Sequence, residues 1–278
     1  MTPSLATTLV VPCYNEERRL RLSAFDDYLR ANPNARVLFV NDGSRDETLS
    51  LLCRFCDTHR KSCVVGDLPQ NQGKGEAVRQ GLLAAIDRGA RMVGYWDADL
   101  AAPLRQAPLM GEILHRDPET HIVIGIRLPL LGRRVRRQRL RGLLGAASAL
   151  LTRRLARIPT RDTQCGAKMF RVTDELRRSL AQPFQSRWLF DVELLLRLRD
   201  EHHGLESVAY EYPLESWTEQ PGSKVGAMSY ARALRELVRA AWFRGPTGHI
   251  GMNDVKQRDA IQIIGEYRDD LSKLRRAA

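Results

Sequence analysis

The chain alternates short apolar runs with longer segments in which apolar residues recur every three or four positions. The short runs are rich in β-branched residues and have the length of strands buried on both faces of a parallel sheet. The longer segments have the period of helices that cover such a sheet. We therefore expect an α/β fold with a mainly parallel sheet flanked by helices, its strands at residues 7–12, 36–40, 62–67, 92–96, 121–125 and 208–213, with a further short strand ending near Val172.

Polar residues predict where several helices begin. Asn15 can cap a helix that continues to about Arg30. Ser44, followed three residues later by Glu47, forms a capping-box pattern and predicts another helix start. Pro103 is expected near the start of a helix that ends before residue 118, because proline is tolerated in the first helical turn.

Charged residues follow several of these strands. Asp97 and Asp99 come directly after the apolar run 92–96, Asp42 ends an earlier strand, and Lys74 lies in a glycine-bearing turn. Open α/β sheets bind ligands at the carboxyl ends of their strands, and Mg²⁺ prefers carboxylate and phosphate oxygens. Two aspartates so spaced also occur in ordinary solvated loops, but the convergence at one sheet edge favours a clamp for a metal and a diphosphate.

The positive charge of the chain is concentrated in one segment. Of its 44 basic residues, eleven are arginines between residues 127 and 161, a segment without lysine, aspartate or glutamate, and the remaining 33 balance 33 acidic residues. Nucleic-acid-binding proteins usually spread basic residues over several elements, so nucleic acid is not the expected partner. The uncharged run 142–152 is too short for the ~20 residues of a membrane-spanning helix. It predicts either a basic element in the interface of an anionic membrane or an ordinary packing helix with solvated arginines.

Cysteine usage and the first residues suggest a compartment. Five cysteines without framework spacing indicate a reducing environment. Cys53 and Cys56, with His59 and Cys63 nearby, could form a metal cluster, although their helical spacing favours core-facing side chains. The chain begins without a basic and then apolar leader, so we expect a cytoplasmic protein that can be peripheral at the inner face of the membrane.

Ordered motifs carry a family resemblance. VPCYNE at 11–16, VNDGS at 40–44, NQGKG at 71–75 and DAD at 97–99 resemble the successive motifs of family 2 glycosyltransferases with the GT-A fold. RDTQCGAKMF at 161–170, RWLFDVEL at 187–194, WTE at 217–219 and GSK at 222–224 resemble the dolichyl-phosphate or polyprenyl-phosphate β-glucosyltransferase subgroup. The resemblance extends from about Thr7 to Trp242.

The resemblance implies roles for individual residues. It implies that the donor, a UDP-sugar, is held by Pro12, Tyr14, Glu16, Asp42, Lys74, Asp97 and Asp99. Asp99, together with Asp97, would coordinate Mg²⁺ or Mn²⁺. Asp191 corresponds to the carboxylate on the acceptor side and, with Asp162, is the catalytic candidate. The candidate acceptor-binding residues are Arg127, Arg133, Arg134, Gln164, Trp217 and Lys224.

We expect one glycosyltransferase domain at residues 1–244 and a tail at 245–278. Within the domain, residues 1–118 form the nucleotide-sugar half, and residues 119–244 form the acceptor half, which contains the basic segment 127–161. The tail changes to a polar composition, and Ile264, Tyr267, Leu271 and Leu274 have the spacing of a short helix that packs on the body or on a second subunit as a homodimer.

Three functions remain as hypotheses. The first is an inverting enzyme that moves a hexose, expected to be glucose, from a UDP-sugar to a polyprenyl phosphate. The second is a soluble family 2 transferase that acts on a sugar or another small hydroxyl acceptor. The third is a nucleotide-sugar or anionic-surface binding module without catalysis, against which the intact pair Asp97 and Asp99 and the carboxylate of Asp191 argue.

Overall fold

The computed structural model describes residues 7–136, 158–186, 189–218 and 260–266, which build a single sheet of eight strands and a small sheet of two. Six strands of the large sheet run in one direction, and β7 and β10 run in the other. In spatial order the strands are β10 (Gln262–Ile264), β3 (Cys63–Leu68), β2 (Ala35–Asp42), β1 (Thr7–Cys13), β4 (Met92–Trp96), β7 (Ala167–Arg171), β5 (Ile122–Ile126) and β8 (Ala209–Pro213).

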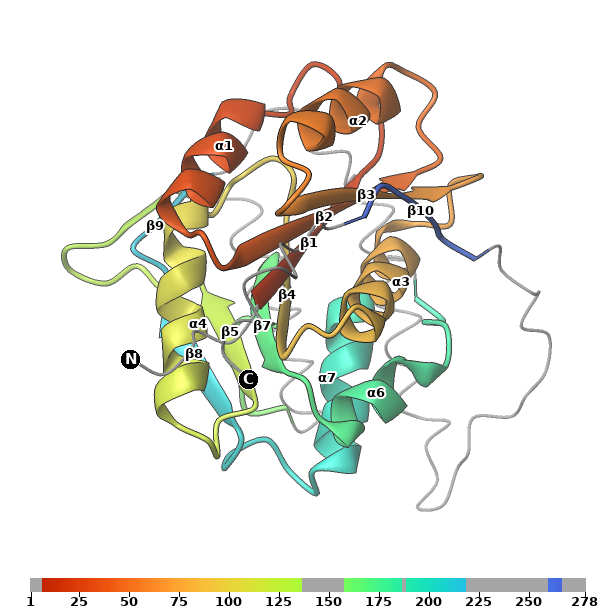
Figure 1. Ribbon diagram of the computed structural model, residues 1–278. Helices are drawn as coiled ribbons and strands as arrows, with labels where there is room; N and C mark the ends of the chain where they lie inside the picture. Colours follow the sequence, from red (N-terminus) through yellow and green to blue (C-terminus); the bar gives the residue numbers. More distant parts are fainter. Residues whose placement is uncertain (1–6, 137–157, 187–188, 219–259, 267–278) are drawn as a thin grey trace, which may run out of the picture.

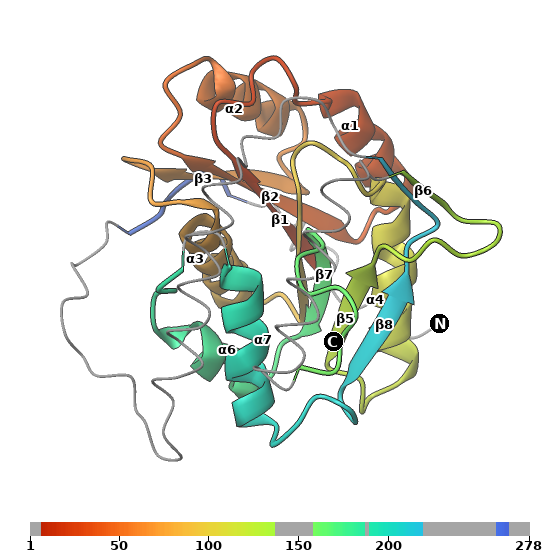
Figure 2. The same cartoon turned by 180° about the vertical axis from the view of Figure 1, so that it is seen from behind.

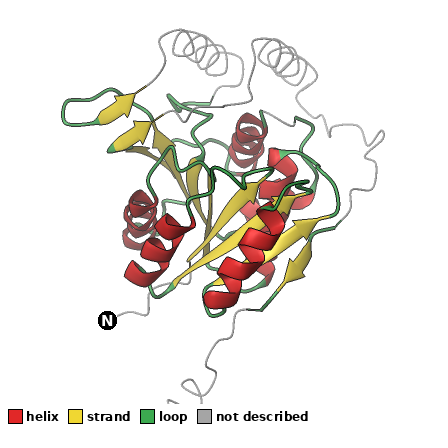
Figure 3. Cartoon of the chain, turned by 90° about the horizontal axis from the view of Figure 1, so that it is seen from above, coloured by secondary structure: helices red, strands yellow, loops and turns green. Residues whose placement is uncertain are grey.

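Helices cover both faces of the large sheet (Figures 1 and 2). One face carries α1 (Leu22–Ala31), α2 (Thr48–Thr58) and α4 (Ala107–Arg116), the last preceded by the 3₁₀ turn η1 (Leu104–Gln106). The other face carries α3 (Lys74–Asp87), α6 (Asp174–Ala181) and α7 (Phe190–Glu201). The small sheet pairs β6 (Arg134–Arg136) with β9 (Ser216–Thr218) and lies beside the main body (Figure 3).

Alternating side chains of the central strands build two hydrophobic cores. In β1, Leu9 belongs to the core under α1, α2 and α4, whereas Val10 belongs to the core under α3, α6 and α7. In β2, Phe39 and Leu38 divide in the same way, because successive residues of a strand point to opposite faces. Burial on both faces explains why these strands read as continuous apolar runs.

The predicted α/β architecture with a mainly parallel sheet is confirmed, but two helix starts are wrong. Asn15 does not cap a helix: it adopts a left-handed backbone conformation with φ 51°, its side chain accepts a hydrogen bond from Arg45 N, and α1 begins only at Leu22. The capping box at Ser44 is also absent, since the Ser44 hydroxyl accepts from Asn15 N and α2 begins at Thr48. In both cases the polar side chain forms a hydrogen bond between two loops instead of capping a helix.

The tail and the cysteines differ from expectation as well. A helix through Ile264 is wrong, because β10 pairs antiparallel with β3 there, and an edge strand can satisfy its backbone by adding a neighbour. The other residues of the predicted tail helix lie outside the described residues. Cys56 of α2 is joined to Cys63 of β3 in a disulfide, a pairing that the sequence did not predict. Cys53 is half-buried on α2, and the described residues contain no group of three or more potential metal-ligating side chains.

The length and hydropathy of the helices bear on membrane crossing. Across 7–136, 158–186, 189–218 and 260–266, none of the helices is both long enough and apolar enough to span a bilayer. The predicted interfacial run at 142–152 lies outside the described residues.

Candidate active site

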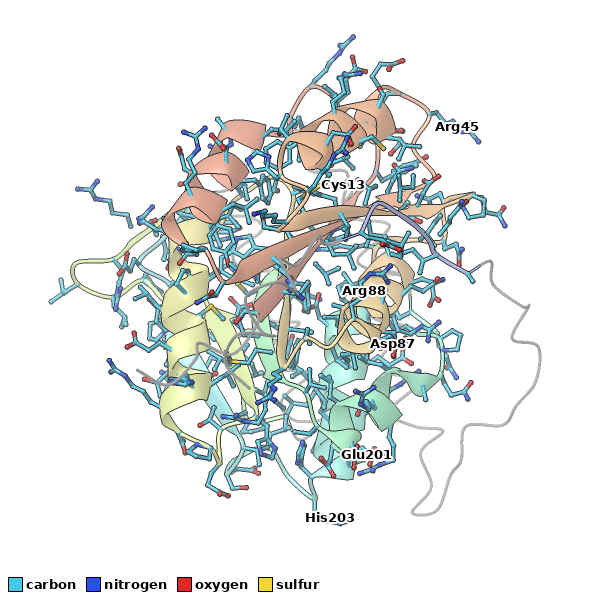
Figure 4. All side chains as sticks on the ribbon, in the orientation of Figure 1. Cys13, Arg45, Asp87, Arg88, Glu201 and His203 are labelled. Carbon is cyan, nitrogen blue, oxygen red and sulfur yellow. A yellow bond between two sulfur atoms is a disulfide. The ribbon has the colours of Figure 1, made fainter. Side chains whose placement is uncertain are left out.

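Two loops at the carboxyl ends of β1 and β2 are tied together by side chains. Asn15 N donates to Ser44 Oγ over 3.0 Å, and Arg45 N donates to Asn15 Oδ1 over 2.9 Å. Glu16 N donates to Thr48 Oγ1 over 2.8 Å. Figure 4 shows Cys13, at the end of β1, inside the molecule and Arg45 at its periphery. The loops that follow the two strands are therefore joined into one connected wall at the carboxyl edge of the sheet.

Asp42 connects this wall to the turn that precedes α3. Its Oδ1 atom accepts from Gln72 N over 2.7 Å, and its Oδ2 atom accepts from Gly73 N and from Asn71 Nδ2, each over 2.9 Å. The Asp42 residue is almost fully buried. A carboxylate with these three donors holds the backbone of the turn, so Asp42 fixes the loop that leads into α3.

Gly43 shows how closely the two loops approach. It has φ +62°, and a Cβ atom at this position would lie 2.4 Å from the main-chain carbonyl carbon of Gln70. Any other residue would be strained in this conformation and would push the loops apart. The glycine of the VNDGS motif is thus required by the packing of backbone against backbone.

Lys74, the first residue of α3, meets the first aspartate of the pair. Lys74 Nζ lies 2.5 Å from Asp97 Oδ1, and both side chains are about one third exposed. Burial acts to lower the pKa of Lys74, but the charges of Asp97, Asp191 and Asp99 outweigh it, so the pKa is raised and the ammonium persists. A lysine held charged at a helix N-terminus is suited to bind phosphate.

Asp99 lies beside Asp97, and within the described residues its carboxylate forms no ion pair with a lysine or an arginine. Its Oδ1 atom accepts from Ala101 N over 3.0 Å. Burial, and then the neighbouring charge of Asp97, raise the pKa of Asp99. Arg21 Nη2 donates to the Asp99 carbonyl oxygen over 3.1 Å and so fixes the backbone of the turn.

The aspartate pair fits a divalent cation. Two adjacent carboxylates repel each other, and a dication would relieve the repulsion that raises the Asp99 pKa. Mg²⁺ is commonly held by one or two carboxylates together with substrate phosphates, so a larger set of protein ligands is not required. Gly166 leaves space for the Asp97 carboxyl group itself, because a Cβ atom at this position would lie 2.1 Å from Asp97 Cγ.

The other donor-side candidates lie on the same wall. Pro12 is within β1, opposite Val40 of β2, and Tyr14 is half-buried in the loop that follows. The Glu16 carboxylate forms an ion pair with Arg19. The structure therefore brings all of the predicted donor-side residues to the edge formed by the ends of β1, β2 and β4 and the start of α3.

Asp191 lies at the start of α7 in a buried cluster of polar side chains. Its Oδ1 atom accepts a hydrogen bond from the Tyr95 hydroxyl and another from Lys168 Nζ, the latter over 2.8 Å. Lys168 is fully buried and also donates to the carbonyl oxygens of Thr163 (2.9 Å) and Cys165 (2.8 Å). Burial raises the pKa of Asp191 to about 7 and lowers the pKa of Lys168 to about 8, because burial disfavours both charged forms.

Asp162, the second catalytic candidate, is engaged by Arg127. Arg127 Nε and Nη2 donate to the two oxygens of Asp162, each over 2.7 Å, and Arg127 N adds a third bond over 3.0 Å. The guanidinium also stacks over Trp217, 5.1 Å from the ring centroid. Burial opposes the charge of Arg127, but the hydrogen bonds that it donates to Asp162 outweigh this effect and raise the Arg127 pKa. This fork joins the end of β5 to the loop before β7.

The remaining acceptor-side candidates are dispersed. Gln164 is half-buried in the loop before β7. Arg133 and Arg134 lie farther along the chain, at the base of the loop that enters β6, and Arg134 is exposed. Lys224 lies outside the described residues, as do residues 137–157 of the basic segment.

Two residues of the buried cluster were missing from the predicted site. Tyr95 and Lys168 pair with each other across β4 and β7, and both side chains reach Asp191. A lysine inside an otherwise apolar strand is the signal that could have identified Lys168, because a lysine is almost never fully buried without partners. Tyr95 carried no such signal, since a buried tyrosine in a strand is common.

Comparison with protein families decides the assignment. The model of the family described as "Glycosyl transferase family 2" matches residues 8–176, which is more than half of the chain. The chain belongs to glycosyl transferase family 2. The matched region contains all of the donor-side residues predicted for this chain, from Pro12 to Asp99. It also contains Asp162 on the acceptor side. The prediction of a family 2 glycosyltransferase is confirmed.

Several curated relatives of this family 2 chain share the name dolichyl-phosphate beta-glucosyltransferase. The chain is 34% identical over 238 residues to the dolichyl-phosphate beta-glucosyltransferase of Drosophila melanogaster, covering 81% of this chain and 70% of that protein. The protein of that name from Homo sapiens is 30% identical over 238 residues, covering 81% of this chain and 71% of its own. The resemblance to this subgroup is confirmed.

Solved structures support the fold of the family 2 chain. The glucosyl-3-phosphoglycerate synthase from Mycobacterium tuberculosis matches with a TM-score of 0.62 and 20% identity, covering 98% of this chain and 93% of that one. The same synthase in complex with Mn²⁺, uridine diphosphate and phosphoglyceric acid matches with a TM-score of 0.60 and 19% identity, covering 85% and 78%. At this identity the likeness concerns the fold, which is the expected GT-A fold.

Proposed function

We propose that this family 2 glycosyltransferase transfers glucose from UDP-glucose to a polyprenyl phosphate of the dolichyl type, with inversion at the transferred carbon. The observation that carries the proposal is the 34% identity to a dolichyl-phosphate beta-glucosyltransferase over most of both chains. The juxtaposition of Lys74, Asp97 and Asp99 at the carboxyl edge of the sheet supports the use of a nucleoside diphosphate donor.

On the donor side, the connected loops after β1 and β2 would receive the uridine, with Pro12, Tyr14, Glu16 and Asp42 on the wall of the crevice. Lys74 would move its ammonium from Asp97 toward the diphosphate. Asp99, with Asp97, would hold Mg²⁺ or Mn²⁺. When bound, this ion would neutralise charge that develops on the departing UDP.

On the acceptor side, a phosphate oxygen would form a bond to C1 of the glucose from the face opposite UDP. The bond from C1 to the UDP oxygen breaks, and UDP keeps the electron pair. A phosphate monoester has a second pKa near ~6 and is largely dianionic at neutral pH, so it needs no base. Cations are needed to hold it, and Arg127, Arg133, Arg134 and Lys224 are our candidates. Gln164 and Trp217 are our further candidates for contact with the acceptor.

In this reaction Asp191 would hold neighbouring groups of the acceptor side in position. Its Oδ1 atom is already engaged by Tyr95 and Lys168, and α7 fixes its position at the edge of the sheet. Asp162 would orient Arg127 through the two-fold hydrogen-bonded fork. Both carboxylates would thus act on cationic groups near the acceptor.

A second candidate function is transfer to a hydroxyl group of a small acceptor. One observation favours it: burial raises the pKa of Asp191 to about 7, which suits a general base at neutral pH. A sugar hydroxyl must lose a proton as it attacks, and Asp191 could receive it. The two candidates therefore differ in what Asp191 does.

A panel of nucleotide sugars separates these functions. UDP release is measured for each donor with the full chain, Mg²⁺ or Mn²⁺, and either a polyprenyl phosphate, a free sugar or no acceptor. We expect the highest rate with UDP-glucose and polyprenyl phosphate. Release with only the hydroxyl acceptor would contradict the first proposal, and binding of UDP without release in any mixture would indicate a binding module.

The acceptor implies a place of action. We propose that the protein works at the cytoplasmic face of a membrane through residues 127–161, because a polyprenyl chain is retained by a bilayer. This basic segment would contact anionic lipid rather than nucleic acid. A homodimer through the tail 245–278 remains a proposal that sedimentation of the full chain at several concentrations would test.

A further inference from the structure

The loop between β5 and β6 exposes two adjacent leucines. Leu130 is 47% exposed and Leu131 is fully exposed at 103%. The other large apolar side chains exposed in the described residues, Leu109, Tyr210 and Ile264, are isolated from one another along the chain and are less exposed than Leu131. Single exposed leucines are ordinary, but a neighbouring pair at one loop tip is a candidate contact surface.

The loop projects from the body of the molecule. It extends outward beside the small sheet in Figure 1, and in the reversed view of Figure 2 it extends outward again beside β6. Leu130 N donates to Leu128 O and Arg133 N donates to Leu130 O, each over 3.0 Å, so the tip is a closed turn. Gly132 has φ +79° and no other group within 4 Å of the position of a Cβ atom. The turn thus holds the leucines away from the core.

Cationic side chains surround the base of this tip. Arg133 and Arg134 follow Gly132 directly, and Arg134 N is anchored to the carbonyl oxygen of Glu215 over 2.9 Å. Arg105 of η1 is 62% exposed and lies near the same acidic residue, with Arg105 Nε 3.8 Å from a Glu215 carboxylate oxygen. With one carboxylate against three guanidinium groups, the base of the loop has a net positive charge.

We propose that residues 128–134, here termed the leucine loop, insert Leu130 and Leu131 into the surface of an anionic lipid bilayer, with Arg133 and Arg134 against the headgroups. Apolar side chains beside cations match the two layers of a bilayer surface, where acyl chains lie just below anionic groups. Two leucines offer far less area than the ~800 Å² that each partner of a stable protein complex buries, so a lipid surface fits this tip better.

The inference rests on the proposed function, which explains why the enzyme contacts a membrane. It adds which part of the chain enters the lipid. The leucine loop begins immediately after Arg127, whose fork holds Asp162. Insertion of the loop would therefore bring the acceptor side of the active site to the membrane surface. A phosphate at the headgroup level would then reach the crevice while its polyprenyl chain stays in the bilayer.

Vesicle flotation of the full chain tests the inference without any turnover. The vesicles contain phosphatidylcholine alone or phosphatidylcholine mixed with phosphatidylserine. Replacement of both Leu130 and Leu131 by serine should weaken binding to the mixed vesicles by about tenfold or more, because the apolar contribution is lost. Arg133→Gln with Arg134→Gln should weaken binding to the mixed vesicles by about fivefold for each charge and leave the weak binding to neutral vesicles unchanged.

Leu109 supplies a matched control, since it is 40% exposed on α4 and does not belong to the leucine loop. Leu109→Ser should leave vesicle binding unchanged, whereas Leu131→Ser should reduce it. In a second pair, Leu131→Trp should shift its emission to shorter wavelength on the mixed vesicles, and Leu109→Trp should not. UDP binding, measured by calorimetry, verifies that each variant is folded.

Three results would overturn the inference. The first is vesicle binding that is unchanged when both leucines are replaced. The second is an equal loss for Leu131→Ser and Leu109→Ser. The third is a loss of self-association in the sedimentation of the double serine variant without a loss of vesicle binding, which would assign the loop to a second copy of the chain. Failure of sugar transfer would contradict the proposed function and leave these binding results untouched.

Discussion

The donor and acceptor sides of the site are held together by different forces. On the donor side, main-chain N–H groups of one loop bind side-chain oxygens of the next, as Asn15 N does with Ser44 Oγ and Gln72 N does with Asp42 Oδ1. On the acceptor side, buried charges pair, as Arg127 does with Asp162 and Lys168 with Asp191. The first arrangement fixes backbone shape, whereas the second depends on each charge retaining its partner.

This difference predicts how each side fails. Loss of one partner of a buried ion pair leaves a desolvated charge, which is strongly destabilising, whereas a loop held by several separate hydrogen bonds loses them one at a time. Substitutions on the acceptor side should therefore affect stability and rate together. Substitution of Asp99 on the donor side should affect the rate alone, because burial and the charge of Asp97 already disfavour the charged form of Asp99.

The largest effect is expected from Asp99→Ala. If Asp99 holds the cation that stabilises the departing UDP, transfer should fall by about 10³-fold, comparable to the loss of a strong electrostatic contact in a transition state. The free energy of unfolding should not decrease, since a raised pKa marks Asp99 as unfavourably placed when charged. UDP-release kinetics and urea unfolding measure the two quantities.

Asp57→Ala is the matched control for Asp99→Ala, because Asp57 is a well-exposed carboxylate on α2. This variant should retain the full rate. EDTA should reduce wild-type transfer to the level of Asp99→Ala, and full activity in the chelator would contradict the role of Asp99 in metal binding.

A smaller but broader effect is expected from Lys168→Met. The change leaves two carbonyl oxygens and the Asp191 carboxylate without their shared donor, so the free energy of unfolding should fall by about 3 kcal/mol. Displacement of Asp191 should lower kcat by about 10²-fold. Addition of Asp191→Asn to this variant should restore part of the stability and not kcat, because the two carbonyl oxygens still lack their donor. Recovery of both stability and kcat would contradict a positioning role for Lys168.

The pH dependence of stability, compared between wild type and Asp191→Asn, tests the raised pKa of Asp191. Burial raises the pKa of Asp191 to about 7, so between about pH 4 and about pH 7 the folded chain binds a proton that the unfolded chain has released. Wild-type stability should therefore decrease as pH rises through this window, and Asp191→Asn should remove that contribution. Urea unfolding midpoints at several pH values measure the slope.

The kinetics of the same variant test what Asp191 does in the reaction. With polyprenyl phosphate, Asp191→Asn should lower kcat by about tenfold through loss of orientation, without a change in the shape of the pH profile. A hydroxyl acceptor would instead lose the ionisation near pH 7 on which a general base depends. Observation of that loss, with no transfer to phosphate, would favour the second candidate function.

The smallest effect is expected from Arg127→Lys. Lysine keeps the positive charge but cannot form the two-fold fork with Asp162 or stack as a plane on Trp217. KM for the phosphate acceptor should rise by about fivefold, and kcat should change little. Arg177→Lys, at an exposed position on α6, is the control and should leave KM unchanged.

The order of strands and helices in the first 118 residues was predictable, because apolar runs of strand length are buried on both faces whatever surrounds them. The aspartates and Lys74 could be assigned to one sheet edge for the same reason, since the carboxyl ends of parallel strands meet there. Helix starts at Asn15 and Ser44 could not be predicted correctly. Each polar side chain had two possible partners, its own helix or a distant loop, and local sequence does not distinguish them.

The sequence by itself determined the α/β architecture, the ordered donor motifs and the family, because these depend on local periodicity and on motifs that each lie within a few residues. Only the tertiary structure decided that Tyr95, Lys168 and Asp191 form one cluster, that Arg127 is held by Asp162, and that β10 adds to the edge of the sheet. The side-chain contacts among these join residues separated by 23 to 96 positions, and the pairing of β10 with β3 joins residues that lie still farther apart along the chain. Their formation depends on which strands become neighbours, and no local propensity encodes that.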